Sequence, residues 1–318
     1  MAATEAPEDE EQLKRQLQNG RMIESVDEMT PGYKKALTLP PKINADIELM
    51  SAPCLFEQAM NAPTLDARNA ELSTIQDEVG HSYISLRLLE NLGVDTDEFL
   101  YNREADEWRT AYAFEMYLEN FAEQSVFHGF LDRAGLTLLA DIHENTSYAP
   151  WRRSLLKVEK EEQFHIRHGE TWFRRLANKN EETKQKIQEA VDWLFPMGLE
   201  LFGFPDDLKT HSDQLDYCIK GMSNDELRQD WMSHVVPLCE DNDIDVPAHF
   251  DEDADEYVLE FEFPVAFDEA NKEWQFDNPV SWDEVLERWR AGGPARDDFV
   301  EMIQTGEVYE GVSEYTAS

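Results

Sequence analysis

The residues of this sequence best suited to chemistry form two Glu-x-x-His motifs, Glu78 with His81 and Glu162 with His165. Residues three positions apart lie on the same face of a helix, so each motif presents a carboxylate beside an imidazole. Both groups are ligands of redox-active metal ions. Glutamate is so common in this chain that about one such pair is expected by chance, so the spacing alone decides little.

The positions of the motifs carry more weight than their spacing. Around Glu162 and His165, apolar residues such as Leu155 and Val158 recur at three- and four-residue steps, as along the buried seam of a packed helix. A bare carboxylate in such a seam is strongly destabilising unless it is paired, protonated or bound to a metal ion. We therefore predict that both motifs ligate metal, rather than being ordinary core histidines beside surface glutamates.

Two further carboxylates complete the pattern of a di-iron bundle, in which two helices each give a Glu-x-x-His and two more each give one carboxylate. Glu48 faces inward on an expected helix and precedes Glu78 by 30 residues, and Asp132 precedes Glu162 by 30 residues. That length fits a path up one helix and back down the next. The near symmetry of the two halves favours one site at one level.

The choice of Asp132 leaves alternatives open, because Glu119, Glu123 and His128 lie on the same expected helix. Glu161 is expected on the surface. A ligand set rich in carboxylate and poor in imidazole suits iron better than zinc, which prefers Cys and His. The predicted ligands of two iron ions are Glu48, Glu78, His81, Asp132, Glu162 and His165.

The helical elements that position these residues follow from periodicity and from cap signals. Thr64 is an expected N-cap, Gly93 an expected stop signal, and Ser223 opens a capping pattern. Pro31, Pro40 and Pro41 mark an entry segment before the first helix. The helices are expected over residues 47–60, 65–92 and 108–140, from 150 onward, and over 181–202 and 224–233.

The C-terminal region changes period. Residues 257–263 alternate as in a strand, residues 274–276 are their expected partner in a small hairpin, and a short helix is expected over 282–289. The predicted fold class is mainly α, a ferritin-like four-helix bundle with additional C-terminal helices and a small β-hairpin. The expected domains are a disordered acidic N-terminus (1–21), the di-iron helical domain (22–246) and a C-terminal extension (247–318).

Charge excludes several classes of function. With 68 Asp and Glu against 28 Lys and Arg, the net charge of −40 argues against binding to nucleic acid or acidic membranes. Acidic residues spread over the whole length indicate a surface suited to high salt, as in halophilic proteins. Cys54, Cys218 and Cys239 lack disulfide or zinc spacing and are expected to be reduced. Without a signal peptide or a long apolar run, a cytoplasmic protein is expected.

Several separated motifs, in this order, resemble one enzyme family, the catalytic A subunit of phenylacetyl-CoA 1,2-epoxidase. The resemblance covers most of the chain from Met22 to Gly293. It is carried by Met29-Thr-Pro-Gly-Tyr-Lys-Lys35, Gln76-Asp-Glu-Val-Gly-His81, Ser147-Tyr-Ala-Pro150, Lys160-Glu-Glu-Gln-Phe-His165, Ser223-Asn-Asp-Glu-Leu-Arg-Gln229 and Trp282-Asp-Glu-Val285 with Gly292-Gly-Pro294.

The resemblance implies the same six ligands, and Asp132 is matched through the run Leu131-Asp-Arg-Ala134. The chain departs from the family pattern at two positions. The family has a glutamate seven residues after the first ligand and a lysine four residues before the second, where this chain has Leu55 and Thr74. Joint loss of both partners leaves neither charge buried alone, yet it changes the polar surroundings of the site.

The resemblance further implies a reaction and its partners. The substrates would be phenylacetyl-CoA and O2, and the product would be the ring 1,2-epoxide formed in aerobic phenylacetate catabolism. Electrons would come from NADPH through a separate reductase with flavin and an iron–sulfur cluster. The complex would also contain two further proteins, a structural C-type subunit plus a small B-type subunit.

Three questions stay open at this point. The aryl-CoA could instead be benzoyl-CoA, or the chain could be a non-catalytic structural partner that keeps the fold. The polyanionic CoA needs local cations, and Arg152, Arg153 and Lys157 are the candidates, although a solvated helix face explains them equally well.

Overall fold

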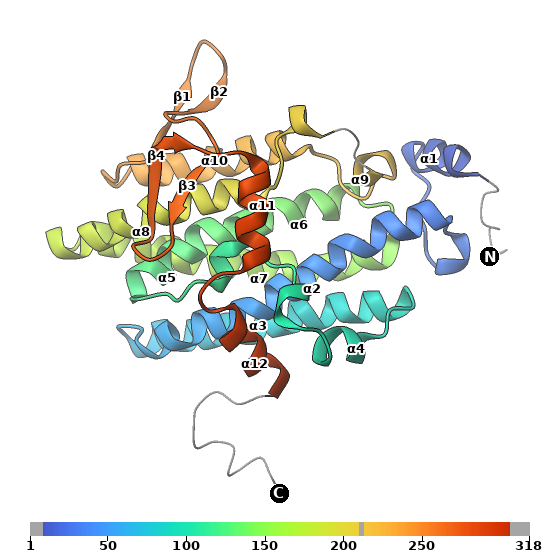
Figure 1. Ribbon diagram of the computed structural model, residues 1–318, viewed down its shortest axis with the longest axis horizontal. Coiled ribbons are helices and arrows are strands. Elements are labelled where there is room, and N and C mark those ends of the chain that lie inside the picture. Colours follow the sequence, from blue (N-terminus) through green and yellow to red (C-terminus); the bar gives the residue numbers. More distant parts are fainter. Residues whose placement is uncertain (1–8, 210–212, 306–318) are drawn as a thin grey trace, which may run out of the picture. The chain divides into compact units, whose positions relative to one another are not determined.

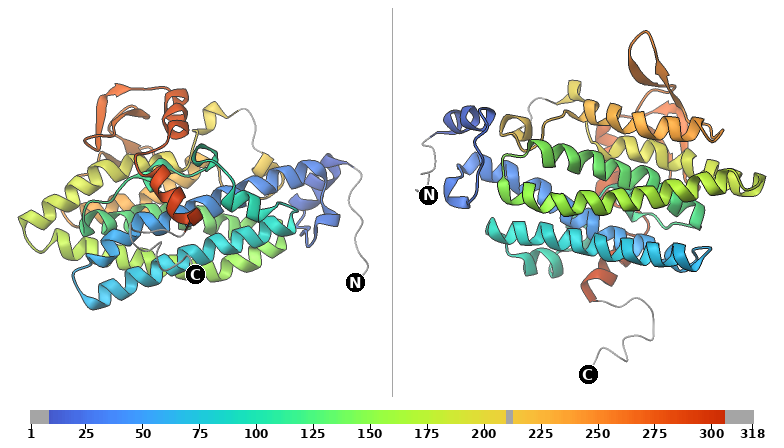
Figure 2. Two further views of the ribbon diagram at one scale, coloured as in Figure 1. Left: turned by 60° about the horizontal axis from the view of Figure 1, so that its bottom comes forward. Right: turned by 180° about the vertical axis from the view of Figure 1, so that it is seen from behind.

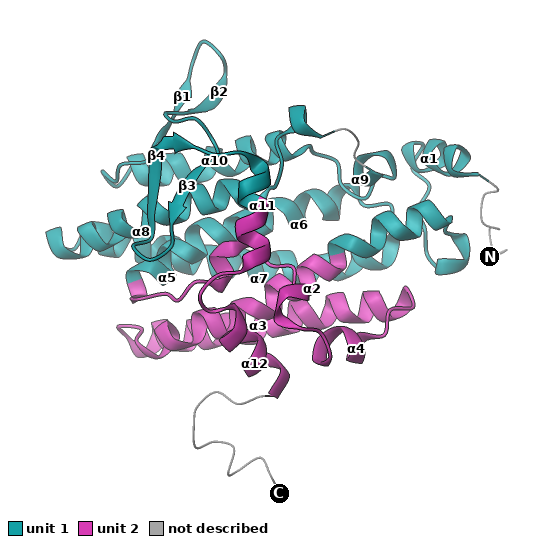
Figure 3. Cartoon of the chain, viewed as in Figure 1, with its two compact units in different colours: residues 1–40, 122–285 teal, residues 41–121, 286–318 magenta. Residues whose placement is uncertain are grey.

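The computed structural model describes residues 9–209 and 213–305, most of which are helical. They divide into two compact units, shown in different colours in Figure 3. Unit 1 comprises residues 1–40 and 122–285, and unit 2 comprises residues 41–121 and 286–318. Each unit is described by itself. The expected domain limits stay a prediction, because compact units report packing within the chain and not independent folding.

Unit 2 is built on two long helices, α2 (Pro31–Met60) and α3 (Leu65–Asn91). The first part of α2, up to Pro40, belongs to unit 1. Hydrogen bonds join the two helices, since the Ser82 hydroxyl donates to the Ala45 carbonyl (2.9 Å) and the Asn44 amide to the Ser85 hydroxyl (3.0 Å). The remaining elements of the unit are α4 (Thr96–Tyr101), η2 (Ala105–Glu107), η3 (Tyr112–Glu115), the end of α11 (Trp282–Ala291) and α12 (Arg296–Thr305).

The start of α2 corrects a prediction. The helix begins at Pro31 and continues through Pro40 and Pro41, where an irregular entry segment was expected. Proline fits the first turn of a helix, and interior prolines remove hydrogen bonds without preventing the helix where packing outweighs that loss. Tyr33 and Leu37 are fully buried on this segment, so its packing supplies the compensation.

Unit 1 contains a layer of long helices. In Figures 1 and 2, α6, α7, α8 and α10 lie side by side. The Trp231 indole donates to the Phe130 carbonyl (2.8 Å) in the core between them. The helical elements of the unit are α1 (Glu10–Gln18), η1 (Val26–Glu28), α5 (Phe121–Phe127), the π-helical turn η4 (His128–Asp132), α6 (Arg133–Asn145), α7 (Ala149–Ala177), α8 (Glu181–Leu201), η5 (Asp206–Leu208), α9 (Asp213–Asp216) and α10 (Asn224–Glu240).

Two further predictions about helices are wrong. Residues 10–18, assigned to the disordered N-terminus, form α1, whose Leu13 and Leu17 are buried. Residues 1–8 lie outside the described residues. The expected helix over 108–140 begins only at Phe121. Before it, Glu115 ends a 3-10 turn and binds Arg296 (2.8 Å) and the Gly293 amide (2.7 Å), so contacts distant in sequence replace the local helix.

The C-terminal strands form two hairpins instead of one. Residues 256–259 (β2, Glu256–Leu259) pair with β1 (Ala248–Asp251), and β4 (Glu273–Pro279) pairs with β3 (Val265–Asp268). The β1–β2 hairpin projects from the helices of unit 1 (Figure 1). Each strand pairs with its nearest neighbour in sequence because a short turn costs less chain entropy than a long connection.

The fold class is confirmed as mainly helical with small antiparallel strand pairs. The expected caps are confirmed as well: Thr64 accepts a hydrogen bond from the Ala67 amide, Ser223 forms a capping box with Glu226, and Gly93 ends its helix with φ +84°. Within residues 9–209 and 213–305, no helix has the length and apolar character needed to cross a membrane.

Candidate functional site

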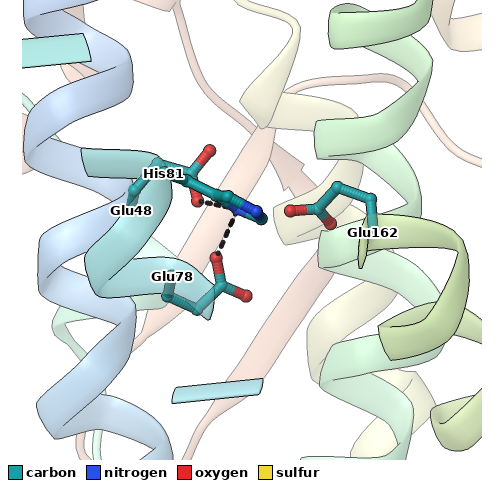
Figure 4. A group of neighbouring side chains, drawn as sticks. All are labelled: Glu48, Glu78, His81 and Glu162. Atoms are coloured by element: carbon teal, nitrogen blue, oxygen red, sulfur yellow. Dashed lines mark ion pairs between the residues drawn. The ribbon is translucent and has the colours of Figure 1, made fainter. Parts of the chain in front are cut away.

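The first cluster lies within unit 2 and joins Glu48 of α2 to Glu78 and His81 of α3. The His81 Nδ1 atom lies 3.5 Å from a Glu78 carboxylate oxygen and 3.7 Å from one of Glu48. All three side chains are buried, and their ligand atoms lie within 4.8 Å of one another. Figure 4 shows both carboxylates turned towards the imidazole ring. The spacing along α3 and the contact with α2 therefore produce a compact group of oxygen and nitrogen donors.

The electrostatics of this cluster show that it is short of positive charge. Burial raises the pKa of Glu48 well above its ordinary value, and the neighbouring Glu78 carboxylate raises it further. His81 opposes this rise without cancelling it. Two buried carboxylates at this distance are stabilised by a shared proton or by a cation, and a divalent metal ion is the cation that also uses the imidazole.

The second cluster lies within unit 1 and joins Asp132 to Glu162 and His165 of α7. The His165 Nδ1 atom lies 3.7 Å from a Glu162 carboxylate oxygen, and ligand atoms of His165 and Asp132 lie within 4.8 Å of each other. All three residues are buried. Asp132 is the last residue of the π-helical turn η4, a distortion that is frequent at functional sites because it reorients a side chain within a helix.

His128, which the sequence offered as another inward group, supports Asp132 instead of replacing it. Its Nδ1 atom lies 2.6 Å from a carboxylate oxygen of Asp132, and both residues are buried. Ligand carboxylates are commonly held by such hydrogen bonds. Glu119 and Glu123 point elsewhere, since Glu119 is exposed and the Glu123 carboxylate lies 3.0 Å from the Lys272 ammonium. In the sequence, the position of His128 four residues before Asp132 was the signal that could have predicted this contact.

Close packing fixes α7 against this turn. A Cβ atom on Gly169 would lie 2.4 Å from the Cβ of His128 and 2.8 Å from the backbone nitrogen of Gly129. Only glycine allows the two segments to approach this closely. Gly169 follows His165 by one turn of the same helix, so the contact helps to set the distance between α7 and η4.

Both departures from the family pattern lie in the interior. Leu55 and Thr74 are fully buried. Within the described part of the chain, the Thr74 hydroxyl has no hydrogen-bond partner. The interior of unit 2 therefore carries no charge at these two positions.

The cations predicted to hold CoA lie at the exposed start of α7. Arg153 forms an ion pair with Glu24 (3.0 Å), and Lys157 forms one with Glu161. Arg152 is exposed and makes no ion pair among the described residues. Two of the three positive charges are thus partly neutralised within the chain.

Unit 1 also contains a buried lysine that no sequence pattern indicated. Lys220 is 6% exposed and donates a hydrogen bond to the Asn224 side chain (2.8 Å). Burial, and to a smaller extent the nearby Lys209, lower the pKa of Lys220 to about 8 against the opposing effect of Asp141. Only burial distinguishes this residue from the other lysines, so spacing cannot identify it.

The donor sets of the two clusters fit iron. Each offers two carboxylates and one imidazole, and neither contains a cysteine thiolate. Such oxygen-rich sets are typical of non-haem iron sites, whereas structural zinc prefers Cys and His.

The chain is similar to known proteins over most of its length. A family model described as phenylacetic acid catabolic protein matches residues 8–271. The A subunit of the 1,2-phenylacetyl-CoA epoxidase of Escherichia coli (strain K12) is 29% identical over 252 residues, which cover 78% of this chain and 81% of the relative. The C subunit of the same enzyme is 25% identical over 158 residues, covering 48% of this chain and 60% of the relative.

Proposed function

Because the chain belongs to the phenylacetic acid catabolic protein family, whose fold is ferritin-like and helical, we propose that it is the oxygen-activating subunit of an aryl-CoA epoxidase. Its similarity to the A subunit of the bacterial enzyme supports a role in phenylacetate catabolism. The observation that carries the proposal is the presence of two buried clusters, each with two carboxylates and one imidazole.

The two clusters would together hold two iron ions as one di-iron centre. The proposed ligands are Glu48, Glu78, His81, Asp132, Glu162 and His165. Four carboxylates balance the charge of two ferrous ions, so the buried set becomes neutral once it is loaded. Iron bound there would supply the redox chemistry that O2 activation requires.

The chain's own residues would prepare the site in two ways. His128 would hold the Asp132 carboxylate in one orientation through their hydrogen bond. Apolar side chains would keep water away from the reacting atoms, and Phe127 just before η4 and Phe130 within η4 are both fully buried. A dry site favours transfer of oxygen to substrate over release of reduced oxygen species.

The proposed reaction joins one atom of O2 to ring carbons 1 and 2 of phenylacetyl-CoA as an epoxide and reduces the other atom to water. This balance needs two electrons and two protons. NADPH would supply the electrons through a separate reductase carrying flavin and an iron–sulfur cluster, and C-type and B-type subunits would complete the enzyme. The similarity to both the A and the C subunits of one enzyme supports such a complex.

Two groups of cations are available for the phosphates of CoA. Arg152, Arg153 and Lys157 remain the proposed group. Lys220 is a second candidate, because a desolvated lysine with a pKa lowered to about 8 gains more from an anionic partner than an exposed one does. A larger rise in KM for the CoA ester in Lys220→Met than in Lys157→Met would favour the second location.

Two rival functions remain. Benzoyl-CoA is a rival substrate of the same class. A non-catalytic structural role is the rival from a different class, and the similarity to the C subunit is the observation that favours it. The presence of all six candidate ligands argues against that role.

Metal analysis separates an enzymatic from a structural role. After anaerobic loading with ferrous iron we expect two ions per chain, and less than about half an ion per chain would overturn the enzymatic proposal. Product analysis with phenylacetyl-CoA and benzoyl-CoA, in the presence of O2, a surrogate reductase and a C-type subunit, then identifies the substrate. Glu78→Ala and His165→Ala should abolish product formation, and full activity in either variant would exclude the proposed site.

A further inference from the structure

The outer face of α7 reverses the charge of the rest of the chain. Its exposed residues include a quarter of the chain's 28 Lys and Arg, namely Arg152, Arg153, Lys157, Lys160, Arg167, Arg174 and Arg175. None of the Asp or Glu residues of α7 is fully exposed. Three of these cations pair with carboxylates, namely Arg153 with Glu24, Lys157 with Glu161 and Arg174 with Glu170. On a protein of net charge −40 the face is still a local cluster of positive charge.

An apolar strip crosses the centre of this cationic face. Leu156 is 52% exposed and Phe164 is 42% exposed. Lys160 and Arg167 follow at four- and three-residue steps on the same side of the helix. Neither cation forms an ion pair with any carboxylate in the part of the chain that the structure describes. Exposed aromatic and arginine side chains at the centre of a patch are typical of protein interfaces.

The strip is connected to the second cluster through ring contacts. The centroid of the Phe164 ring lies 6.2 Å from that of His165 and 6.4 Å from that of His168. The His168 ring lies 6.3 Å from His128, which is hydrogen-bonded to Asp132. A molecule seated on Phe164 is therefore separated from a proposed iron ligand by a single ring contact.

We infer that the outer face of α7, defined by Leu156, Lys160, Phe164 and Arg167, is the docking surface for an acidic one-electron carrier protein. The inference rests on the proposed function, because a redox centre that turns over needs electrons from outside the chain. An acidic partner is repelled by most of a strongly acidic surface and can approach where the local charge is reversed. On this face the exposed Phe164 ring also contacts the buried His165 ring.

The electron balance defines the class of partner. Each turnover consumes two electrons and two protons per O2, and one oxygen atom leaves as water while the other enters substrate. The iron–sulfur cluster of such a reductase donates one electron at a time and is reduced again by the flavin of the same protein. Two brief encounters per turnover suit a weak interface built from charge and one aromatic anchor.

A register-matched comparison with α3 supplies the control for the test. Lys160 and Arg167 stand two residues before and five residues after Glu162, and Gln76 and Tyr83 occupy the same positions relative to Glu78. Gln76 and Tyr83 are exposed and uncharged. Two double variants therefore lower the net charge by the same amount. Lys160→Gln/Arg167→Gln changes the outer face of α7, and Gln76→Glu/Tyr83→Glu changes the outer face of α3.

The test measures binding of an acidic reductase that contains flavin and a [2Fe–2S] cluster. Its Kd for the metal-free chain should rise about tenfold in Lys160→Gln/Arg167→Gln at low salt and change little in Gln76→Glu/Tyr83→Glu. In the loaded enzyme, the KM for reductase should rise in parallel. Single turnover of enzyme reduced by dithionite should be unchanged, because no carrier is then needed.

Several outcomes would overturn the inference. An equal rise in Kd for both double variants would mean that only the net charge matters, and no rise in Kd for either would mean that this face does not bind the reductase. Slower dithionite-driven turnover in Lys160→Gln/Arg167→Gln would show that the substitutions act on the reaction and not on docking. A rise in KM for the CoA ester with an unchanged Kd for reductase would assign the face to substrate instead. Because the Kd is measured on the metal-free chain, a failure of iron loading would reject the proposed function without affecting this result.

Discussion

The helices α3 of unit 2 and α7 of unit 1 share one buried chemistry and differ on their outer faces. In both, an imidazole Nδ1 atom faces the carboxylate three residues earlier, at 3.5 Å in α3 and 3.7 Å in α7. The exposed residues in the middle of α3 carry no charge, and they are Asn69, Leu72, Ser73, Gln76, Val79 and Tyr83. The exposed face of α7 is cationic. The proposed metal binding would constrain the inner faces in the same way, whereas the outer faces are free to follow different neighbours.

The two helices also differ in how their motifs are supported. Beside α7, the π-helical turn carries His128 and Asp132, and Gly169 sets the distance to it. Along the interior of α2 and α3, Leu55 and Thr74 add no charge around the cluster. The motif on α7 is thus supported by a second imidazole and by close packing, whereas the motif on α3 has no charge at the positions of Leu55 and Thr74.

Removing one carboxylate from each helix should have the largest effect and tests whether the two motifs are equivalent. We expect Glu78→Ala and Glu162→Ala each to lower epoxide formation about a thousandfold, because a missing ligand prevents assembly of the whole site. Iron content per chain and product yield are the measurements. A large loss in only one variant would show that a single cluster carries the activity.

Charging the interior of unit 2 should have the next largest effect. Thr74→Lys and Leu55→Glu each place one charge at a fully buried position and should each cost about 3 to 5 kcal/mol in the free energy of unfolding. The double variant should recover at least about 1 kcal/mol, because the two charges can then pair. Urea unfolding of the four proteins measures this coupling. Additive losses would mean that the two side chains do not meet.

The pH dependence of unfolding can test how the buried Lys220 differs from the exposed Lys160 of unit 1. Burial holds the pKa of Lys220 at about 8, below its ordinary value of 10.5. The unfolded chain therefore binds the extra proton between these values, and the free energy of unfolding should rise with pH across that window, by roughly 3 kcal/mol at most. Lys220→Met should remove this rise and Lys160→Met should keep it. An identical pH profile for wild type and Lys220→Met would contradict the assignment.

The smallest expected effect compares glycines on the two helices. Gly169→Ala should destabilise by about 2 kcal/mol, because its Cβ would lie 2.4 Å from His128 Cβ. Gly80→Ala on α3 meets no atom within 4 Å and should stabilise by up to about 1 kcal/mol through higher helix propensity. Thermal unfolding measures both. Equal effects in the two variants would argue against the close approach of α7 to η4.

The sequence determined what depends on neighbours along the chain. Glu-x-x-His spacing places both groups on one helix face, and Thr64, Gly93 and Ser223 act within one turn of their helices, so each could be predicted from local geometry. The helical class and the family resemblance follow from the same patterns and from several motifs in order.

Only the tertiary structure decided features that depend on residues far apart in sequence. Buried packing carries α2 through Pro40 and Pro41, and Arg296 holds Glu115 where a helix was expected. The π-helical turn brings His128 to Asp132, although the sequence presented the two as competitors for one role. The charge of the outer face of α7 became visible only once exposure was known, because a helical pattern alone does not tell which face the fold covers.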